Sequence, residues 1–216
     1  MKEQRKAGKI SHGDKCLVVV AHPDDETLWA GGLILSRPDA EWVVLALTRG
    51  SDPDRAPKFH KAMNELRARG IMGDLDDSRE LPPLKKDDIQ KSIIDLIPSN
   101  VYDIIITHSL KGEYSRHIRH EEIAEAAGQL WDTNRIISKE LWRFAYEDGG
   151  KKYLPHAESS ADFVYDLPKK VWQKKHEIIT EVYGFSKDSF EARTTPRKEA
   201  FWIFRKQTIH INIKEE

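Results

Sequence analysis

The feature that most constrains the fold is the stretch from Cys16 to Gly32, which reads CLVVVAHPDDETLWAGG. Its apolar start includes three valines, a composition typical of a strand buried on both faces of a sheet. Pro23 lacks a backbone donor and favours an extended conformation at His22, so we expect the strand to end there. Glu26 then opens a helical pattern of apolar residues. The stretch predicts a strand, a tight polar turn and a helix, which places polar side chains at the carboxyl edge of a parallel sheet.

Further strands and helices alternate along the chain. Apolar runs predict strands at residues 41–47, 101–107, 141–146, 162–166, 200–205 and 208–213. Helical spacing predicts helices at residues 58–69, 87–97, 120–131 and 169–182, with Gly70 as the C-cap of the first and an irregular segment at 71–83. The alternation predicts an α/β fold, a Rossmann-like three-layer α/β/α sandwich with a mostly parallel sheet. We expect a flexible N-terminal tail at residues 1–14 and a single domain over residues 15–216.

The composition argues against several classes of partner. Lys plus Arg (35) nearly balances Asp plus Glu (36), so no global field favours nucleic acid or an anionic membrane. No apolar run approaches the roughly 20 residues of a membrane span, and the first fifteen residues lack the apolar region of a signal peptide. The single cysteine, Cys16, excludes an intrachain disulfide framework. We therefore expect a cytoplasmic protein, and the sequence leaves its oligomeric state open.

Polar side chains follow two of the predicted strands. His22, Asp24 and Asp25 come after the first, and His117 and His120 come after the strand at residues 101–107. Because neighbouring parallel strands end at one edge, these residues offer a metal site of two histidines and one carboxylate with open positions. Asp24, if it is not a ligand, would take a proton from water. Alternatively, the acids complement the helix dipole and the two histidines lie on the surface.

The same residues resemble a known family. The run Ala21-His22-Pro23-Asp24-Asp25-Glu26, followed by Gly31-Gly32, resembles the AHPDDE…GG signature of the PIG-L/LmbE-like zinc-dependent N-acetylglucosaminyl deacetylases. Residues 107–120, THSLKGEYSRHIRH, resemble the second motif of that family, TH…GEYGHPDH. Lys169 and His176 fall where the family carries a lysine and a histidine on a late helix. The resemblance covers about residues 15–205.

The resemblance implies a site and a reaction. It implies that His22, Asp25 and His120 bind Zn2+, and Fe2+ accepts the same ligands. It implies that Asp24 is the general base that activates the metal-bound water, and that His117 stabilises the oxyanion or protonates the leaving amine. The implied enzyme is a hydrolase of a linear amide, which removes the N-acetyl group from an N-acetylglucosamine-type sugar or glycoconjugate. The resemblance thus implies that its partner is a small-molecule amino sugar.

The chain departs from the family at the second motif. His117-Ile118-Arg119-His120 stands where the family has HPDH, and we expect the Arg119 cation to lower the pKa of His117. One extra residue separates Tyr114 from His117, which puts a substrate contact of Tyr114 in question. The arginine that the family carries after its second strand has three candidates here: Arg55, Lys58 and Arg67.

Two other functions stay open. A degenerate second motif fits a non-catalytic sugar-binding relative, which would bind its ligand without releasing acetate. Two histidines and one carboxylate also suit a non-haem Fe(II) enzyme, which would consume dioxygen. Outside the motifs, three further positions are candidates for supporting or contacting roles: His108 beside the site, Asp76 or Asp77 for a substrate hydroxyl, and His156 in a loop that would cover the crevice.

Overall fold

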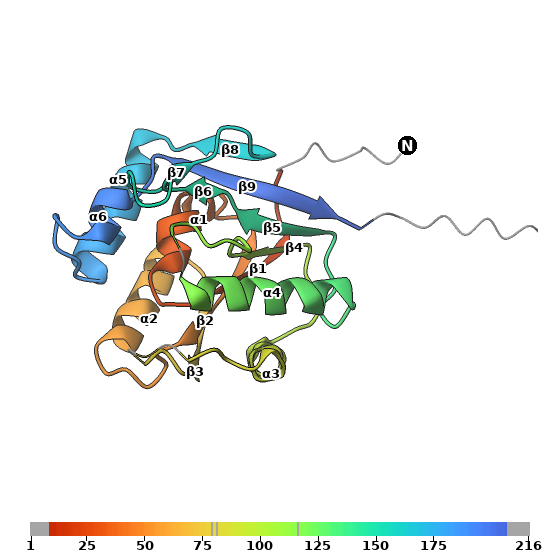
Figure 1. Ribbon diagram of the computed structural model, residues 1–216. Coiled ribbons are helices and arrows are strands. Elements are labelled where there is room, and N and C mark those ends of the chain that lie inside the picture. The colour runs from red at the N-terminus through yellow and green to blue at the C-terminus, as the bar shows by residue number, and fades with distance from the viewer. Residues whose placement is uncertain (1–8, 79, 81, 116, 207–216) are drawn as a thin grey trace, which may run out of the picture.

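The structure, a computed structural model, describes residues 9–206 except residues 79, 81 and 116 (Figure 1). Its centre is a seven-stranded sheet of order β3-β2-β1-β4-β5-β9-β8. Its strands are β1 (Lys15–Val20), β2 (Glu41–Thr48), β3 (Arg69–Leu75), β4 (Ile104–Thr107), β5 (Glu140–Phe144), β8 (Phe163–Asp166) and β9 (Lys198–Arg205). Only the pairings of β9 with β5 and β8 are antiparallel in this sheet. A separate antiparallel pair joins β6 (Tyr146–Glu147) to β7 (His156–Ala157).

Helices cover both faces of the sheet (Figure 1). One apolar cluster packs α1 (Asp25–Leu35), α2 (Arg55–Leu66), the π-helical turn η1 (Ile178–Val182) and α6 (Phe190–Thr194) on the first face, and α5 (Lys169–Glu177) packs against α1. A second cluster packs α3 (Lys86–Leu96) and α4 (Ile118–Asp132) on the other face. Alternate residues of β1 serve the two clusters, Val18 the first and Val19 the second. The predicted three-layer α/β/α class with a mostly parallel sheet is confirmed.

The strand order reverses direction between β1 and β4. In doubly wound folds, ligands bind in the crevice outside the carboxyl ends of the strands at such a reversal. Two threonine hydroxyls fix the end of β1 there: Thr107 donates to the Val19 carbonyl and Thr48 to the Ala21 carbonyl, each at 2.9 Å. The two polar turns that follow β1 and β4 therefore meet at this crevice.

Gly32 lies inside α1 against a buried ion pair. The Glu199 carboxylate on β9 accepts hydrogen bonds from the backbone N–H groups of Gly32 and Leu33 and from Lys175 Nζ, each at 2.7 Å. Lys175 and Glu199 are both fully buried, and burial lowers the pKa of Lys175. A Cβ atom on Gly32 would lie 2.4 Å from the Leu167 methyl groups and 2.9 Å from the Glu199 carboxylate, so a larger residue there would have to displace both side chains.

The structure corrects three of the predicted segments. The helix predicted at residues 58–69 is α2, and it ends through Arg67 in the left-handed conformation (φ 54°), not at Gly70. Gly70 lies in β3, where a Cβ atom would come within 2.7 Å of Phe59, so its small size allows the strand to pack on α2. Residues 71–83, predicted to be irregular, begin within β3, a half-exposed edge strand with a weak apolar pattern. The strand predicted at 141–146 divides into β5 and β6.

Other segments lie near the ends of the described residues. Within residues 1–14, expected to form a tail, Ile10 is buried and packs into the first apolar cluster. The sequence did not predict α6, a five-residue helix capped by Ser189. The strand predicted at 208–213 lies outside the described residues.

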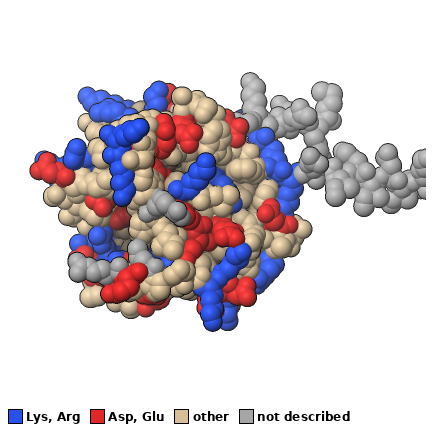
Figure 2. Space-filling model, in the orientation of Figure 1, with Lys and Arg blue, Asp and Glu red and all other residues tan. Residues whose placement is uncertain are grey.

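Among the described helices, none combines the length and apolar character needed to cross a membrane. Basic and acidic side chains are interspersed over the face in Figure 2.

Candidate active site

The three side chains that the family resemblance implied as metal ligands converge at the crevice. The Oδ2 atom of Asp25 lies 3.2 Å from Nδ1 of His22 and 3.3 Å from Nε2 of His120, and these two nitrogens are 3.3 Å apart. Two atoms that each bind a tetrahedral ion at 2.0–2.1 Å are about 3.3–3.4 Å from each other. The three atoms therefore fit three corners of one tetrahedral site, and the donor set suits a divalent metal.

Second carboxylates orient both histidines. Nδ1 of His120 lies 2.6 Å from Oε2 of Glu113, and Nε2 of His22 lies 3.1 Å from Oδ1 of Asp77. Arg49 holds Asp77 in turn, with Nη2 2.6 Å from Oδ2. Such carboxylate–histidine pairs fix the tautomer and turn the other ring nitrogen toward a metal. The sequence patterns alone indicate no role for Glu113, although its place between His108 and His120 in the second motif is a signal for one.

His108 links the end of β1 to Glu113, the carboxylate that orients His120. Its ring is fully buried, and Nε2 lies 2.9 Å from the backbone N–H of Ala21, which can only donate. Nδ1 therefore carries the proton and donates to Glu113 at 2.9 Å. Asp25, His108 and His120 also bring potential ligand atoms together. Because the Nε2 lone pair of His108 is already used, His108 fits a supporting role better than a ligand role.

The charges of the cluster are strongly coupled. Burial alone would lower the pKa values of His22 and His120, yet their carboxylate partners, Asp25 above all, raise these values to about 9 and about 10. Burial opposes ionisation of Asp25 and Glu113, but the adjacent histidines outweigh it. They hold the pKa of Asp25 well below its usual range and that of Glu113 at about 2. The cluster therefore binds protons that a metal would displace.

Asp24, next to Asp25 in the chain, is not one of these ligand atoms and has a strained backbone conformation. Its φ of 130° and ψ of −29° are unusual for a residue with a side chain. Its backbone N–H donates to Oε2 of Glu26 (3.0 Å), a fully buried carboxylate that also accepts the hydroxyl of Tyr183 (2.7 Å). Its own carboxylate pairs with Arg55 at 3.4 Å. Burial and the charge of Asp25 raise the pKa of Asp24 well above its usual range, which makes it a stronger base.

His117 faces the same cluster from the N-terminus of α4. Its ring stacks on His120 (centroids 4.5 Å apart) and meets His22 edge-on (4.7 Å). Its Nδ1 atom is buried and has no hydrogen-bond partner in the described part of the chain. Burial, followed by the charges of His120 and His22, lowers the pKa of His117 to about 4. Potential ligand atoms of His22, His117 and His120 also lie within 4.8 Å of one another.

Arg119 does not act on His117 as the sequence analysis expected. The pKa of His117 is lowered, but the causes are burial and the two neighbouring histidines. The fully buried guanidinium of Arg119 instead binds the segment after β3. It donates to the carbonyls of Asp76 (2.7 Å) and Pro82 (2.8 Å) and to Glu122 (2.6 Å). Arg119 thus anchors the segment that carries Asp77.

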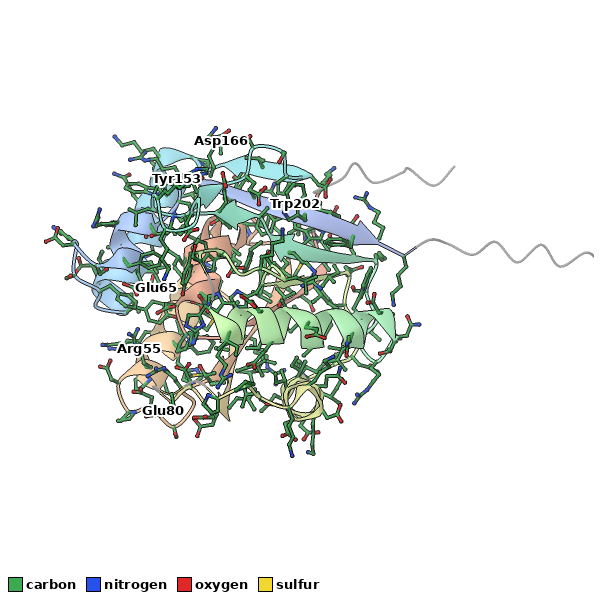
Figure 3. All side chains as sticks on the ribbon, viewed as in Figure 1. Arg55, Glu65, Glu80, Tyr153, Asp166 and Trp202 are labelled. Carbon is green, nitrogen blue, oxygen red and sulfur yellow. The ribbon has the colours of Figure 1, made fainter. Side chains whose placement is uncertain are left out.

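A cavity of about 350 Å³ opens onto these groups. Its lining comes from the turn after β1 and the start of α1, from the segment after β2 and the first turn of α2, from the segments after β3 and β4, and from α6. Of the three basic candidates, Arg55 lines the cavity from the first turn of α2, where Figure 3 labels it. Lys58 pairs with Asp54, and Arg67 ends α2. Tyr114 also lines the cavity, so the extra residue before His117 does not remove it from the site.

Two expected contacts have a different outcome. Asp77 lines the cavity, yet its carboxylate binds His22 and Arg49. His156 lies on β7, exposed and stacked on Tyr153 (4.8 Å), and is not among the residues that line the cavity. The lining also includes Phe190 and Glu191 of α6, which the sequence does not predict because no local pattern links α6 to the two motifs.

A model of the GlcNAc-PI de-N-acetylase (PIG-L) family matches residues 17–131, more than half of the chain. The chain belongs to this family. It is also 24% identical over 179 residues to the uncharacterized protein L374 of Acanthamoeba polyphaga mimivirus, a match that covers 76% of each chain. The family match over residues 17–131 includes all five residues that the two motifs single out: His22, Asp24, Asp25, His117 and His120.

Solved structures share the fold at low sequence identity. The N,N'-diacetylchitobiose deacetylase from Pyrococcus horikoshii has a TM-score of 0.69 at 14% identity, covering 94% of this chain and 88% of that one. A deacetylase of the teicoplanin biosynthesis pathway has a TM-score of 0.62 at 15% identity (89% and 98% covered). GalB, the 4-carboxy-2-hydroxymuconate hydratase from Pseudomonas putida KT2440, has a TM-score of 0.60 at 17% identity (90% and 98%). These likenesses establish the fold.

Proposed function

We propose that the protein is a metal-dependent N-deacetylase that removes the acetyl group from an N-acetylglucosamine-type sugar or glycoconjugate. The observation that carries the proposal is the convergence of His22, Asp25 and His120 to within 3.3 Å, with Asp24 beside them on a separate partner. Membership of a de-N-acetylase family and a fold shared with two deacetylases support the same reaction.

Nδ1 of His22, Oδ2 of Asp25 and Nε2 of His120 would hold the metal, and imidazole with carboxylate suits both zinc and ferrous iron. When bound there, such an ion supplies Lewis-acid chemistry: it polarises an amide carbonyl and makes water more acidic. Glu113 and Asp77 keep the two imidazoles oriented for this role.

Asp24 acts first as the base and then as the acid. It takes a proton from the attacking water as the new carbon–oxygen bond forms. It then gives this proton to the nitrogen of the leaving amine as the carbon–nitrogen bond breaks. The products are a free amine and acetic acid, which ionises to acetate by releasing its proton to water. The raised pKa of Asp24 suits it to hold the proton between the two steps.

His117 acts as a neutral hydrogen-bond donor to the oxyanion. Its Nδ1 atom has no carboxylate partner among the described residues, so nothing there stabilises an imidazolium. The lowered pKa of His117, caused by burial and by His120 and His22, points the same way. A preorganised donor of this kind typically contributes 10²–10³-fold to the rate.

The fold alone does not choose the reaction, because the GalB hydratase shares it. What favours hydrolysis is a base with a raised pKa directly beside the three ligand atoms. A non-haem Fe(II) enzyme would need dioxygen and typically a 2-oxoacid, so oxygen consumption with such a co-substrate would identify that alternative.

The test is acetate release from a panel of N-acetylglucosaminides by the zinc-loaded protein and by Asp24→Ala. We expect release by the parent, a loss of about 10²–10⁴-fold in the variant, and equal metal content in both. Bound metal without acetate from any member of the panel would favour the non-catalytic sugar-binding relative. Failure to bind a stoichiometric metal would overturn the metal centre itself.

A further inference from the structure

One wall of the cavity comes from outside the matched part of the family. The proposed ligands and catalytic residues all lie within residues 17–131, whereas α6 spans Phe190–Thr194. In Figure 1, α6 lies beyond the sheet at the left of the view. Both Phe190 and Glu191 line the cavity. The side chains that determine substrate specificity at this wall can therefore differ between members of the family, while the catalytic residues stay the same.

The backbone of α6 is firmly held. Ala192 and Thr194 are each 5% exposed, and the Ser189 hydroxyl accepts the Ala192 N–H at 3.1 Å. The carbonyl of Glu191 accepts the N–H (3.0 Å) and the hydroxyl (2.9 Å) of Thr195. The side chains of Phe190 and Glu191 are thus presented to the cavity from a fixed frame.

Phe190 offers an apolar surface beside the reacting groups. Its side chain is 38% exposed, and its ring centroid lies 5.1 Å from that of Tyr114 at an angle of 65°. The Tyr114 ring lies in turn 5.5 Å from His120. A single aromatic ring therefore separates Phe190 from a proposed metal ligand, and covering the exposed ring would bury apolar area.

Glu191 offers an acceptor next to that surface. Its carboxylate forms no hydrogen bond or ion pair with any of the described residues. An ionised carboxylate is an acceptor only, with two oxygens that can receive two hydroxyl groups. The apolar ring of Phe190 and the adjacent carboxylate of Glu191 are complementary to a pyranose, which has an apolar C–H face and hydroxyl donors around its edge.

We propose that Phe190 and Glu191 form a subsite for the pyranose ring that carries the acetamido group. The C–H face of the sugar packs on Phe190 and Tyr114, and neighbouring hydroxyls donate to Glu191. The inference rests on the proposed deacetylation and adds the two residues that make the site select a neutral, hydroxyl-rich ring. These are binding contacts away from the scissile bond, so they act on affinity more than on turnover.

The test compares Phe190→Ala and Glu191→Gln with two matched controls outside the lining. Tyr153→Ala removes another exposed aromatic ring (43% exposed, labelled in Figure 3), and Asp188→Asn removes an exposed carboxylate just before α6. With a methyl N-acetylglucosaminide we expect KM and Kd to rise about tenfold in each cavity variant, kcat to stay within about twofold, and the controls to match the parent. Turnover of the acyclic N-acetylethanolamine should be equal in all five proteins.

The outcomes separate this subsite from the proposed reaction. If the parent releases acetate but Phe190→Ala and Glu191→Gln leave Kd and KM unchanged, or weaken the acyclic amide equally, the subsite is wrong and the deacetylase stands. If the parent binds the glycoside and the variants weaken it, but no acetate appears, the subsite stands and the deacetylase is wrong. A parent that neither binds nor cleaves the glycoside overturns both.

Discussion

Oε2 of Glu113 lies 2.6 Å from Nδ1 of His120, and both side chains are fully buried. This contact leaves Nε2 of His120 as the ring atom that faces His22 and Asp25. The same carboxylate oxygen receives the proton of His108, so one acid fixes two rings, one directly after β4 and one in α4. The geometry of the ligand atoms therefore depends on a residue that is not among them.

Replacing Glu113 with Gln should weaken metal binding by about 10–100-fold, because the variant loses the charge that orients and polarises His120. The measurement is a competition titration with a chelator. Glu125→Gln is the control, since Glu125 is an exposed acid on α4 whose carboxylate pairs with Lys86. An affinity within about twofold of the parent would show that Glu113 does not tune the site.

Protons should compete with the metal up to high pH. The pKa values of His22 and His120 are raised to about 9 and about 10, so without metal both rings hold a proton at neutral pH. Since binding must displace both protons, affinity should fall as pH falls, by up to about 100-fold per pH unit below pH 9. Chelator competition from pH 6.5 to 9.5 measures this slope. Ordinary histidines, with pKa values of roughly 6.5, would give a constant affinity above about pH 7.5.

His117 and His120 should separate catalysis from metal binding. His120→Ala removes a proposed ligand and should abolish stoichiometric metal. His117→Ala removes the proposed oxyanion donor and should lower kcat by about 10²–10³-fold while metal content stays near one per chain. Metal analysis after dialysis, beside acetate release, distinguishes the two. Loss of metal from His117→Ala would instead make His117 a ligand, in line with its distance from His22 and His120.

Restoring the family aspartate at position 119 should harm this protein. Arg119 is surrounded by acceptors: the carbonyls of Asp76 and Pro82 and the carboxylate of Glu122. Arg119→Asp would leave them without a donor and place a buried negative charge beside Glu122, at a cost of about 3–5 kcal/mol. Urea unfolding of the metal-free variant measures this cost, and Arg119→Lys, which keeps the charge, should lose less. If Arg119→Asp is as stable as the parent and releases more acetate, Arg119 has no structural role and its replacement of the family aspartate only impairs catalysis.

The sequence predicted what is local in the chain. The strand and turn around His22 and the spacing of His117 and His120 are each written in one short segment, so both turns and their meeting at the sheet edge could be inferred. The partners of Asp77 and Glu199 could not be predicted in this way. Asp77 contacts His22, and Glu199 contacts Gly32, only because the tertiary fold brings distant segments together. Glu199 lies 167 positions from Gly32, and Asp77 lies 55 positions from His22. The place of Phe190 in the cavity lining could not be predicted for the same reason.

The two neighbouring glycines of the first motif should respond differently to alanine. A Cβ atom on Gly31 would lie 3.3 Å from the Thr27 methyl group and 3.6 Å from Lys175, contacts that small shifts relieve. Alanine also favours a helix interior over glycine by about 0.5–1 kcal/mol, so Gly31→Ala should be close to neutral. On Gly32 the new methyl group would meet Leu167 at 2.4 Å and push on the carboxylate that holds Lys175. We expect Gly32→Ala to lose about 1–3 kcal/mol in urea unfolding, and equal effects at the two positions would contradict the close approach of Glu199 to α1.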